Sequence, residues 1–370
     1  MKTKEYFHNL DGWRTISFLL VFFYHSFHTE NSSILNSETY IFVTKKLFIN
    51  GNIGVNFFFV LSGFLITYFV IQEKLITGKI QVVNFWTRRI LRIWPLYFFC
   101  VVFGFLIFPF LKIYFGQIPA ETAHLLNYIT FTSNFDMINN GLPDASILGV
   151  LWSVAIEEQF YLIWPILLIL VPSKRFIYLF ASLILINIGY RIFNSQDIQL
   201  EMHSLSCMGD LVIGSLSAYL VLTKEKFLIF MKNLPKWAIM MFYFGLFSFL
   251  FFRTQISNVS PVLLIFERLI LAIFIAVIIL EQNYAVHSFF KMKNFKMLSR
   301  LGKYTYSMYC LHFVGILITL QLTKLLKFNT ELWQVLIFET LLSMILTIVM
   351  AYLSYQYLEK PVLKLKKRFS

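Results

Sequence analysis

The sequence LDGWRTISFLLVFFYHSFH, residues 10–28, places an arginine and a histidine in an otherwise apolar run. Arg14 and His25 are eleven residues apart, which on an α-helix separates them by ~16 Å along the axis. A bilayer core is ~30 Å thick, so a helix that enters at Arg14 places His25 near the membrane midplane. An ionisable side chain at that depth is costly, which indicates a functional site. His25 is therefore a candidate general base or transient acyl carrier, and the alternative is a packed histidine bonded to a neighbouring helix.

Two consecutive carboxylates lie well inside the apolar segment LWSVAIEEQFYLIWP, residues 151–165. Glu158 and Tyr161 are three residues apart on one helix face, so they could act together. A carboxylate there could orient the His25 ring and stabilise its protonated form, as the acid does in a nucleophile–histidine–acid array. Spacing alone leaves open whether Glu157 or Glu158 has this role.

Further polar residues are candidates for lining a substrate cavity. Asn56 and Ser62 lie in GVNFFFVLSGFLIT, residues 54–67, where the small residues also allow close packing of helices. A second histidine, His312, lies deep in a later apolar segment and favours a polar chamber between helices. The complete set of cavity candidates is Asn56, Ser62, Trp152, Ser153, Glu157 and His312.

Three arginines, Arg88, Arg89 and Arg92, stand at the start of another apolar segment, in FWTRRILRIWPLY. A guanidinium pairs bidentately with phosphate, so this cluster could hold the phosphates of a cytoplasmic donor. The alternative interpretation is ordinary positive charge on the cytoplasmic side of a membrane span.

The composition shows which elements must position these residues. Of 370 residues, 58% are hydrophobic and 14% are charged, whereas about a quarter of a soluble domain is charged. The chain is therefore expected to be an all-α, multi-pass membrane protein, with one domain over residues 1–370 and no appended soluble domain. Ten segments approach the ~20 apolar residues that a spanning helix needs. They are roughly 13–30, 53–71, 93–111, 149–171, 176–190, 204–222, 237–252, 262–280, 304–323 and 332–355.

The distribution of Lys and Arg predicts the orientation. With the N-terminus in the cytoplasm, these residues are about threefold more frequent on the cytoplasmic side, which favours both termini inside. This bias explains most of the net charge of +13 without a nucleic-acid partner. The three scattered cysteines indicate neither a disulfide framework nor zinc, and no metal site is expected. The longest loop, residues 112–148, then lies outside, and a lid over an acceptor site is one interpretation of it.

Taken together and in order, these motifs resemble the acyltransferase-3 family, bacterial membrane O-acyltransferases that modify extracytoplasmic sugars. The resemblance covers nearly the whole chain. It rests on LDGWR through YHS, GVNFFFVLSGFLIT, RRILRIWPLY, LWSVAIEEQFYLIWP, YTYSMYCLHF and the terminal YLEKP.

The resemblance implies a role for several of these positions. His25 corresponds to the proposed catalytic histidine and Arg14 to its paired arginine, while Arg89 and Arg92 correspond to arginines of donor handling. Glu158 and Tyr161 correspond to a carboxylate–tyrosine pair. Two features are expected to depart from the pattern: Asn56 stands where many relatives have an acid, and no SGNH-type esterase-like domain is expected after the last span.

The resulting hypothesis is an O-acyltransferase, most simply an O-acetyltransferase of the cell envelope, in the bacterial inner membrane. Acyl-CoA, expected to be acetyl-CoA, is the co-substrate, and no permanently bound cofactor is expected. The acceptor is a hydroxyl of an extracytoplasmic or lipid-linked polysaccharide. The sequence leaves the oligomeric state open. The rival interpretation is a proton-coupled transporter or flippase, because buried Glu and His residues would also suit a carrier.

Overall fold

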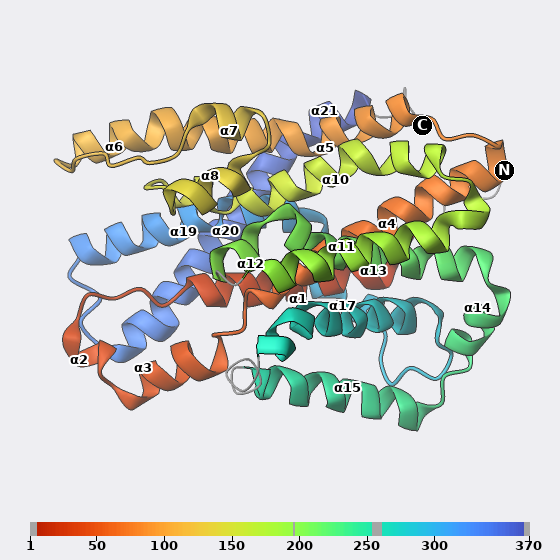
Figure 1. Cartoon of the computed structure of the whole chain (residues 1–370). Helices are drawn as coiled ribbons and strands as arrows, with labels where there is room; N and C mark the ends of the chain where they lie inside the picture. Colours follow the sequence, from red (N-terminus) through yellow and green to blue (C-terminus); the bar gives the residue numbers. More distant parts are fainter. Residues whose placement is uncertain (1–5, 195–196, 254–260, 366–370) are drawn as a thin grey trace. The chain divides into compact units, whose positions relative to one another are not determined.

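A computed structural model describes residues 6–194, 197–253 and 261–365 of the chain, and within these ranges every regular element is a helix (Figure 1). Large apolar side chains are exposed on many of these helices, among them Phe110, Phe244 and Leu341. Exposed apolar surface of this kind is stable only against lipid or another apolar partner. The prediction of an all-α, multi-pass membrane protein is confirmed.

Eight helical stretches are long and apolar enough to cross a membrane, and the pair α14 and α15, bent by 89°, is a possible ninth. The eight are Ile53–Thr77, Val82–Tyr114, Ser146–Leu170, Ser173–Phe193, Ile198–Thr223, Val262–Tyr284, Lys296–Leu325 and Gln334–Lys364. Within the described ranges, the first predicted span, α1 (His8–His25), does not pass this test. The count of ten and the side on which the termini lie therefore stay predictions.

The end of α1 corrects the sequence-based boundary. The helix ends at His25, whereas the apolar run predicted a span over residues 13–30. Phe27 adopts a left-handed backbone with φ of 69°, which breaks the helix, and its carbonyl accepts a hydrogen bond of 2.5 Å from Tyr40 Oη. The Phe27 ring packs on a small cluster of Ile34, Tyr40 and Val335. His25 is therefore a terminal residue of its helix and does not lie partway along it.

The contacts divide the chain into two compact units, each assembled from three separate stretches. Unit 1 comprises Met1–Thr15, Val55–Val82 and Ile156–Gly302. Unit 2 comprises Ile16–Gly54, Val83–Ala155 and Lys303–Ser370. The single domain expected from the sequence stays a prediction.

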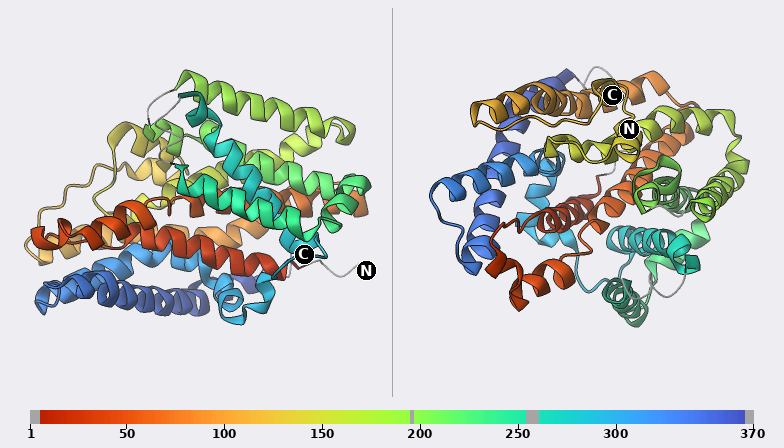
Figure 2. Two further views of the ribbon diagram at one scale, coloured as in Figure 1. Left: turned by 90° about the horizontal axis from the view of Figure 1, so that it is seen from below. Right: turned by 60° about the vertical axis from the view of Figure 1, so that its left-hand side comes forward.

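Unit 1 is built around α13 (Ser204–Thr223), which packs against α11, α12, α14 and α17 (Figure 2). Its elements besides α13 and the start of α1 are α4 (Ile53–Thr77), α10 (Leu151–Leu170), η3 (Ser173–Arg175), α11 (Phe176–Phe193), α12 (Asp197–Met202), α14 (Glu225–Lys232), α15 (Lys236–Phe251), α17 (Pro261–Tyr284), η4 (Met292–Asn294), α18 (Lys296–Leu301) and η5 (Gly302–Tyr304). The first two residues of α4, the first five of α10 and the last two of η5 belong to unit 2.

Two glycines bring α4 and α13 into main-chain contact. A Cβ atom added at Gly63 would lie 1.9 Å from the Leu211 carbonyl oxygen, and one added at Gly214 would lie 1.9 Å from the Val60 carbonyl oxygen. Neither position can hold a side chain unless the helices separate. The close packing that the small residues of GVNFFFVLSGFLIT indicated is confirmed at Gly63.

Unit 2 contains the long pair α19 (Thr305–Leu325) and α20 (Thr340–Ser354), which lie side by side (Figures 1 and 2). Its other elements are the end of α1, α2 (Ser32–Leu35), α3 (Glu38–Phe42), η1 (Val43–Leu47), α5 (Val82–Val102), η2 (Phe103–Ile107), α6 (Phe108–Tyr114), α7 (Leu125–Ile129), α8 (Ser133–Asn140), α9 (Ser146–Gly149), η6 (Gln334–Glu339), η7 (Tyr355–Glu359) and α21 (Lys360–Lys364).

The loop over residues 112–148 is a folded segment organised by carboxylates. Glu121 accepts hydrogen bonds from the main-chain N–H groups of Thr122, Ala123, Asp144 and Ala145, at 3.0–3.1 Å. Asp144 in turn accepts 2.7 Å bonds from Lys112 Nζ. These bonds pair main-chain groups that lie outside the short helices α7 and α8, so the connecting main chain is also held in place.

A third carboxylate, Asp136, is buried in the same segment. It accepts hydrogen bonds from the main chain and ring of His124 and from the amides of Asn127 and Asn140, at 2.7–3.0 Å. Burial alone would raise the pKa of Asp136, but these bonds stabilise the carboxylate and together hold its pKa below the usual value. The segment is thus ordered by charge, and its role as a lid stays a prediction.

Candidate active site

The two membrane histidines singled out in the sequence meet in unit 2. Nδ1 of His25, at the end of α1, lies 3.1 Å from Nε2 of His312 in α19. Their ring centroids are 5.2 Å apart with planes inclined by 26°. His312 is fully buried and His25 is half-buried. The structure thus brings the two histidines together, and the polar chamber that a second deep histidine favoured stays a prediction.

The hydrogen bonds of this pair determine where the protons lie. Nδ1 of His312 is 2.7 Å from the Tyr309 carbonyl oxygen, which can only accept, so this nitrogen carries a proton. In neutral His312 the Nε2 atom is then an acceptor, and Nδ1 of His25 must donate to it. Neutral His25 consequently holds its lone pair on Nε2. Among the described residues no hydrogen bond reaches that atom, so it can act as a base or nucleophile.

The surroundings of the pair are mainly aromatic. The Phe313 ring lies 4.7 Å from that of His25, and Phe18 and Phe22 lie 6.2 Å and 6.5 Å from that of His312. Such an environment strengthens the polar contacts inside it, because little water screens them. The pair is thus held in a defined orientation.

Ser153 joins this region through Tyr309. Its hydroxyl lies 2.7 Å from Tyr309 Oη and donates at 3.1 Å to the Val150 carbonyl. Tyr309 also supplies the carbonyl that orients His312. Trp152 is buried beside Ser153 in the first turn of α10. Both residues therefore lie in the unit that holds the histidine pair, and their contact with a substrate stays a prediction.

In unit 1, Tyr161 connects two of the predicted residues. Its hydroxyl donates at 2.7 Å to Oε2 of Glu157, one turn earlier in α10, and makes a short hydrogen bond with Ser62 Oγ of α4. The structure thus shows Glu157 as a partner of Tyr161, and the pairing of Tyr161 with Glu158 stays a prediction. The i, i+4 spacing brings these side chains together as readily as i, i+3 does.

Asn56 belongs to a buried ionic cluster that the sequence analysis missed. Its amide donates at 3.0 Å to Oδ2 of Asp210, and the Arg268 guanidinium contacts the same oxygen at 2.8 and 2.9 Å. Asp210 is fully buried and the Arg268 side chain is only 11% exposed. The acid absent from position 56 is therefore present on α13.

The predicted arginines lie in two places. In unit 1, Nη1 of Arg14 contacts Oδ1 of Asp11 at 2.6 Å, one turn earlier in α1. In unit 2, Arg88, Arg89 and Arg92 lie on α5, where the Arg89 guanidinium stacks 5.6 Å from the Phe85 ring centroid. Their part in donor handling stays a prediction. The same holds for the pairings of His25 with Glu158 and with Arg14, because the partners belong to different units.

Comparisons with known proteins agree with the resemblance. The family described as "Acyltransferase domain" (acyltransferase-3) matches residues 7–356. The O-acetyltransferase OatA of Staphylococcus aureus (strain NCTC 8325 / PS 47) is 27% identical, covering 98% of this chain and 58% of the relative. The peptidoglycan O-acetyltransferase OatA of Listeria monocytogenes is 26% identical, covering 98% of this chain and 56% of the relative. The chain thus spans little more than half the length of these relatives. No solved structure matches.

Proposed function

Because this chain belongs to the acyltransferase-3 family, we propose that it is a membrane O-acetyltransferase of a cell-envelope polysaccharide. The donor is cytoplasmic acyl-CoA, most simply acetyl-CoA, and the acceptor is a hydroxyl of a glycan outside the cytoplasm or linked to lipid. The names of the relatives support acetyl as the group and a cell-wall glycan as the acceptor. The corresponding location is the bacterial cytoplasmic membrane.

The observation that carries this proposal is the histidine pair. Acyl transfer needs a base that removes the acceptor proton as the oxygen attacks the thioester carbonyl. Nε2 of His25 is available for this, and Nδ1–H of His25 donates to His312, which fixes the tautomer and the ring orientation. His312 thus acts as a positioning residue, comparable to the acid that orients the histidine in a hydrolase triad.

In the direct route, Nε2 of His25 takes the hydroxyl proton while the acceptor oxygen bonds to the thioester carbon. The C–S bond then breaks, and the imidazolium returns the proton to the departing CoA thiolate. In the two-step route, Nε2 itself attacks the thioester carbon and the C–S bond breaks, which releases the CoA thiolate. The acceptor oxygen then bonds to the acyl carbon, the C–N bond breaks, and the hydroxyl proton passes to the freed Nε2 and from there to the thiolate. Both routes use the same lone pair, so the geometry serves either.

The α5 arginines give the proposal a donor-binding element. Guanidinium groups bind phosphates bidentately, and Arg88, Arg89 and Arg92 lie within two turns of one helix. We assign them to the phosphates of CoA at the stage when the thioester, at the opposite end of the CoA molecule, reaches His25, as distinct from any earlier site of donor binding. Tyr161 is assigned to donor binding with these arginines, and its partners Glu157 and Ser62 are assigned to the substrate cavity.

The test uses the whole chain in lipid vesicles with radiolabelled acetyl-CoA and a soluble cell-wall oligosaccharide. The expected result is release of CoA with label on the oligosaccharide as an alkali-labile ester, and loss of both in His25→Ala. A transporter or flippase would instead move label or lipid without breaking the thioester. Wild-type protein that releases no CoA under any acceptor condition contradicts the proposal.

A further inference from the structure

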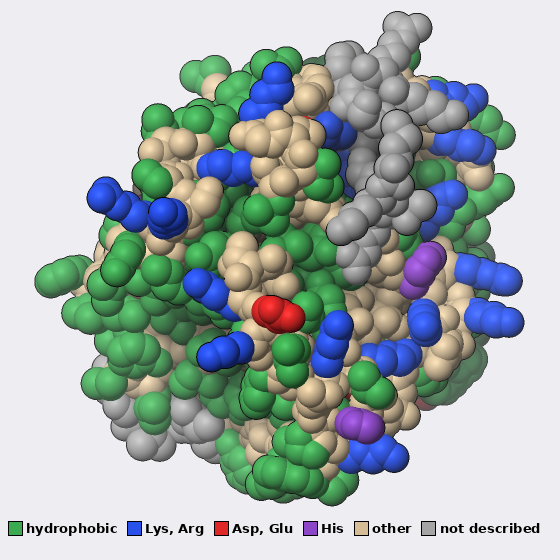
Figure 3. Space-filling view, turned by 90° about the vertical axis from the view of Figure 1, so that its right-hand side faces the viewer, with side chains coloured by type: hydrophobic (Ala, Val, Ile, Leu, Met, Phe, Trp, Pro, Cys, Tyr) green, Lys and Arg blue, Asp and Glu red, His purple; other side chains and the backbone are tan. Residues whose placement is uncertain are grey.

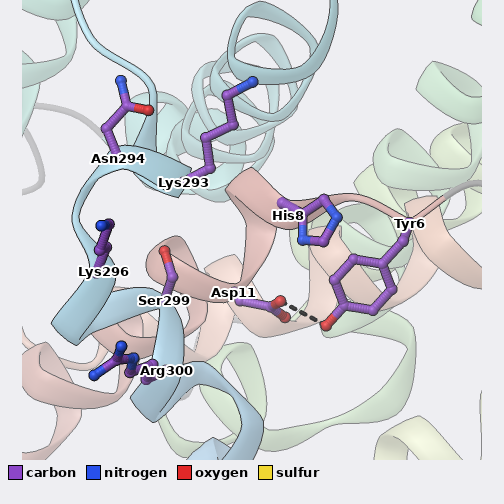
Figure 4. A pocket seen from close by; sticks show the side chains of 8 residues that line it. All are labelled: Tyr6, His8, Asp11, Lys293, Asn294, Lys296, Ser299 and Arg300. Atoms are coloured by element: carbon purple, nitrogen blue, oxygen red, sulfur yellow. Dashed lines mark hydrogen bonds between the residues drawn. The ribbon is translucent and has the colours of Figure 1, made fainter.

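An open pocket of about 670 Å³ lies in unit 1, outside the groups discussed so far. Figure 4 shows that one wall is the start of α1 and the other is the stretch over η4 and α18. We call it the basic pocket, and it is lined by Tyr6, His8, Asp11, Lys293, Asn294, Lys296, Ser299 and Arg300. Both walls come from segments that the charge distribution predicts to be cytoplasmic.

The lining carries a surplus of positive charge. Lys293, Lys296 and Arg300 are permanent cations, and Asp11 is the one acidic residue among the lining side chains. Asp11 is already occupied, because Oδ1 contacts Arg14 at 2.6 Å and Oδ2 accepts from Tyr6 Oη at 2.6 Å. In the part of the chain that the structure describes, Lys293, Lys296 and Arg300 form no ion pair. The same preponderance of Lys and Arg (blue) over acidic side chains (red) is visible on the face in Figure 3.

Lys291, which is close in sequence to the cations of the basic pocket, has a structural role. Lys291 Nζ contacts the carbonyl oxygens of Glu281, Gln282 and Ala285, at 2.8–2.9 Å, and so neutralises the end of α17. Burial lowers the pKa of Lys291, and the charge of Lys293 lowers it further. The carbonyl oxygens that Lys291 contacts do not contact the Lys293 side chain. Lys291 therefore has a structural role that Lys293 does not share.

The walls of the basic pocket are fixed by hydrogen bonds. Asn9 of α1 donates at 2.8 Å to the Gln282 carbonyl and accepts at 3.0 Å from the Lys293 N–H. Thr15 donates at 2.8 Å to the Leu298 carbonyl. Gly302 approaches α1 so closely that an added Cβ would lie 2.2 Å from the Asp11 carbonyl oxygen. The cations are therefore presented on a preorganised cradle, which lowers the entropic cost of binding.

The shape and chemistry of the basic pocket fit a phosphorylated nucleotide. Its volume is in the range of small-ligand sites, which hold roughly 300–1,000 Å³. Arg300 can bind a phosphate bidentately while the two lysines supply point charges. The Tyr6 ring is 61% exposed and lies 4.5 Å from the His8 ring, so it offers a surface on which a base can stack. The cations alone would also suit a lipid headgroup, and the stacking surface is the feature that favours a nucleotide base.

We propose that the basic pocket binds the phosphorylated nucleotide end of the acyl donor, with Lys293, Lys296 and Arg300 on its phosphates and Tyr6 against its base. This inference rests on the proposed function, because it takes acyl-CoA as the donor. It assigns a donor site separate from the α5 arginines. It also explains why Lys293, Lys296 and Arg300 lie together in one pocket, whereas membrane topology alone would allow them anywhere on the cytoplasmic side.

The test measures equilibrium binding of radiolabelled CoA, without acceptor, to the full chain in nanodiscs of uncharged phosphatidylcholine. The variant Lys293→Gln with Lys296→Gln is compared with Lys226→Gln with Lys232→Gln, which removes the same charge from two exposed lysines of α14. The expected result is about tenfold weaker binding in the first variant, a loss near 1.4 kcal/mol, and less than about twofold in the second. Tyr6→Phe and Tyr6→Leu both remove the hydrogen bond to Asp11, so weaker CoA binding in Tyr6→Leu than in Tyr6→Phe should report the contribution of the ring.

Two outcomes overturn the inference and leave the proposed function intact. One is equal CoA affinity in both double variants while wild-type protein still turns over acetyl-CoA. The other is loss of co-purifying phosphatidylglycerol from the pocket variant with CoA affinity unchanged, which would assign the cations to a lipid headgroup. Wild-type protein that fails to bind CoA at all overturns the inference and the proposed function together.

Discussion

The two units each bury a polar cluster, and the clusters differ in kind. In unit 1, Asp210 is surrounded by Asn56 and Arg268, so opposite charges meet. In unit 2, His25 and His312 meet as neutral rings, and one nitrogen of His25 is left for another partner. The charges of the first cluster compensate each other, although the buried Oδ1 of Asp210 has no hydrogen-bond partner among the described residues. The second cluster has no such charge compensation between its rings, and the lone pair on Nε2 belongs to a half-buried side chain. Burial of an ionisable group is thus weaker evidence of catalysis than a lone pair held in a fixed direction on a less buried side chain.

The largest expected effect tests the unused lone pair. His25→Ala should lower CoA release by at least ~100-fold, because a positioned general base commonly contributes that much. The thermal midpoint of the purified protein should change little, since the side chain is half-buried at a helix end. Near-normal turnover in a folded variant would remove the distinction between the two clusters.

The next effect concerns the ionic cluster of unit 1. Asp210→Ala leaves Arg268 as an uncompensated buried cation, so unfolding free energy should fall by about 3–5 kcal/mol. Chemical denaturation in detergent can measure this. The double change Asp210→Leu with Arg268→Met removes both charges and should recover most of the loss. If it recovers nothing, the cluster has a role beyond mutual neutralisation.

A smaller effect separates positioning from packing at His312. His312→Met fills a similar volume but accepts no strong hydrogen bond from His25, so kcat should fall by about tenfold. His312→Gln can place an acceptor oxygen near the former Nε2 atom and should restore a large part of kcat. Equal kcat values in the two variants would assign His312 to packing alone.

The smallest effect is a pH dependence confined to the 112–148 segment. The folded pKa of Asp136 lies below its unfolded value, so its contribution is present above about pH 4 and is lost as pH falls through the folded pKa. Amide hydrogen exchange around α7 and α8 should therefore rise, beyond the intrinsic rate change, as the solution is acidified. In Asp136→Asn the same amides should be poorly protected already at pH 7, with little further pH dependence.

The sequence predicted the helices well because apolar periodicity and length decide them. It could not predict the contact between His25 and His312, which are 287 positions apart, or that between Asn56 and Asp210, because spacing carries no information on such pairs. Arg268 was missed for another reason. It was not singled out within the apolar segment 262–280, whereas in the structure it lies within α17 and forms an ion pair with a buried acid.

The cations of the basic pocket show a second case in which the sequence did not reveal which residues lie together. Lys293, Lys296 and Arg300 were counted as evidence of topology, and nothing in their spacing marked them as a group facing the start of α1. One signal was present in the sequence: residues 291–300 contain four cations, and no acidic residue lies between Glu281 and Glu331. A run of cations without acids is typical of ordinary cytoplasmic loops as well, so the structure was needed to assign a pocket to it.

The glycine contact between α4 and α13 has a consequence for the cluster beside it. Because Gly63 and Gly214 let main-chain atoms touch, the spacing of the two helices is set by the peptide backbone and not by side-chain size. Asn56 lies two turns from Gly63, and Asp210 lies one turn from Gly214. The main-chain contact therefore determines the length of the hydrogen bond between Asn56 and Asp210. A single methyl group added at position 63 would push α4 away from α13. It would thereby lengthen the hydrogen bond between Asn56 and Asp210 without changing either residue.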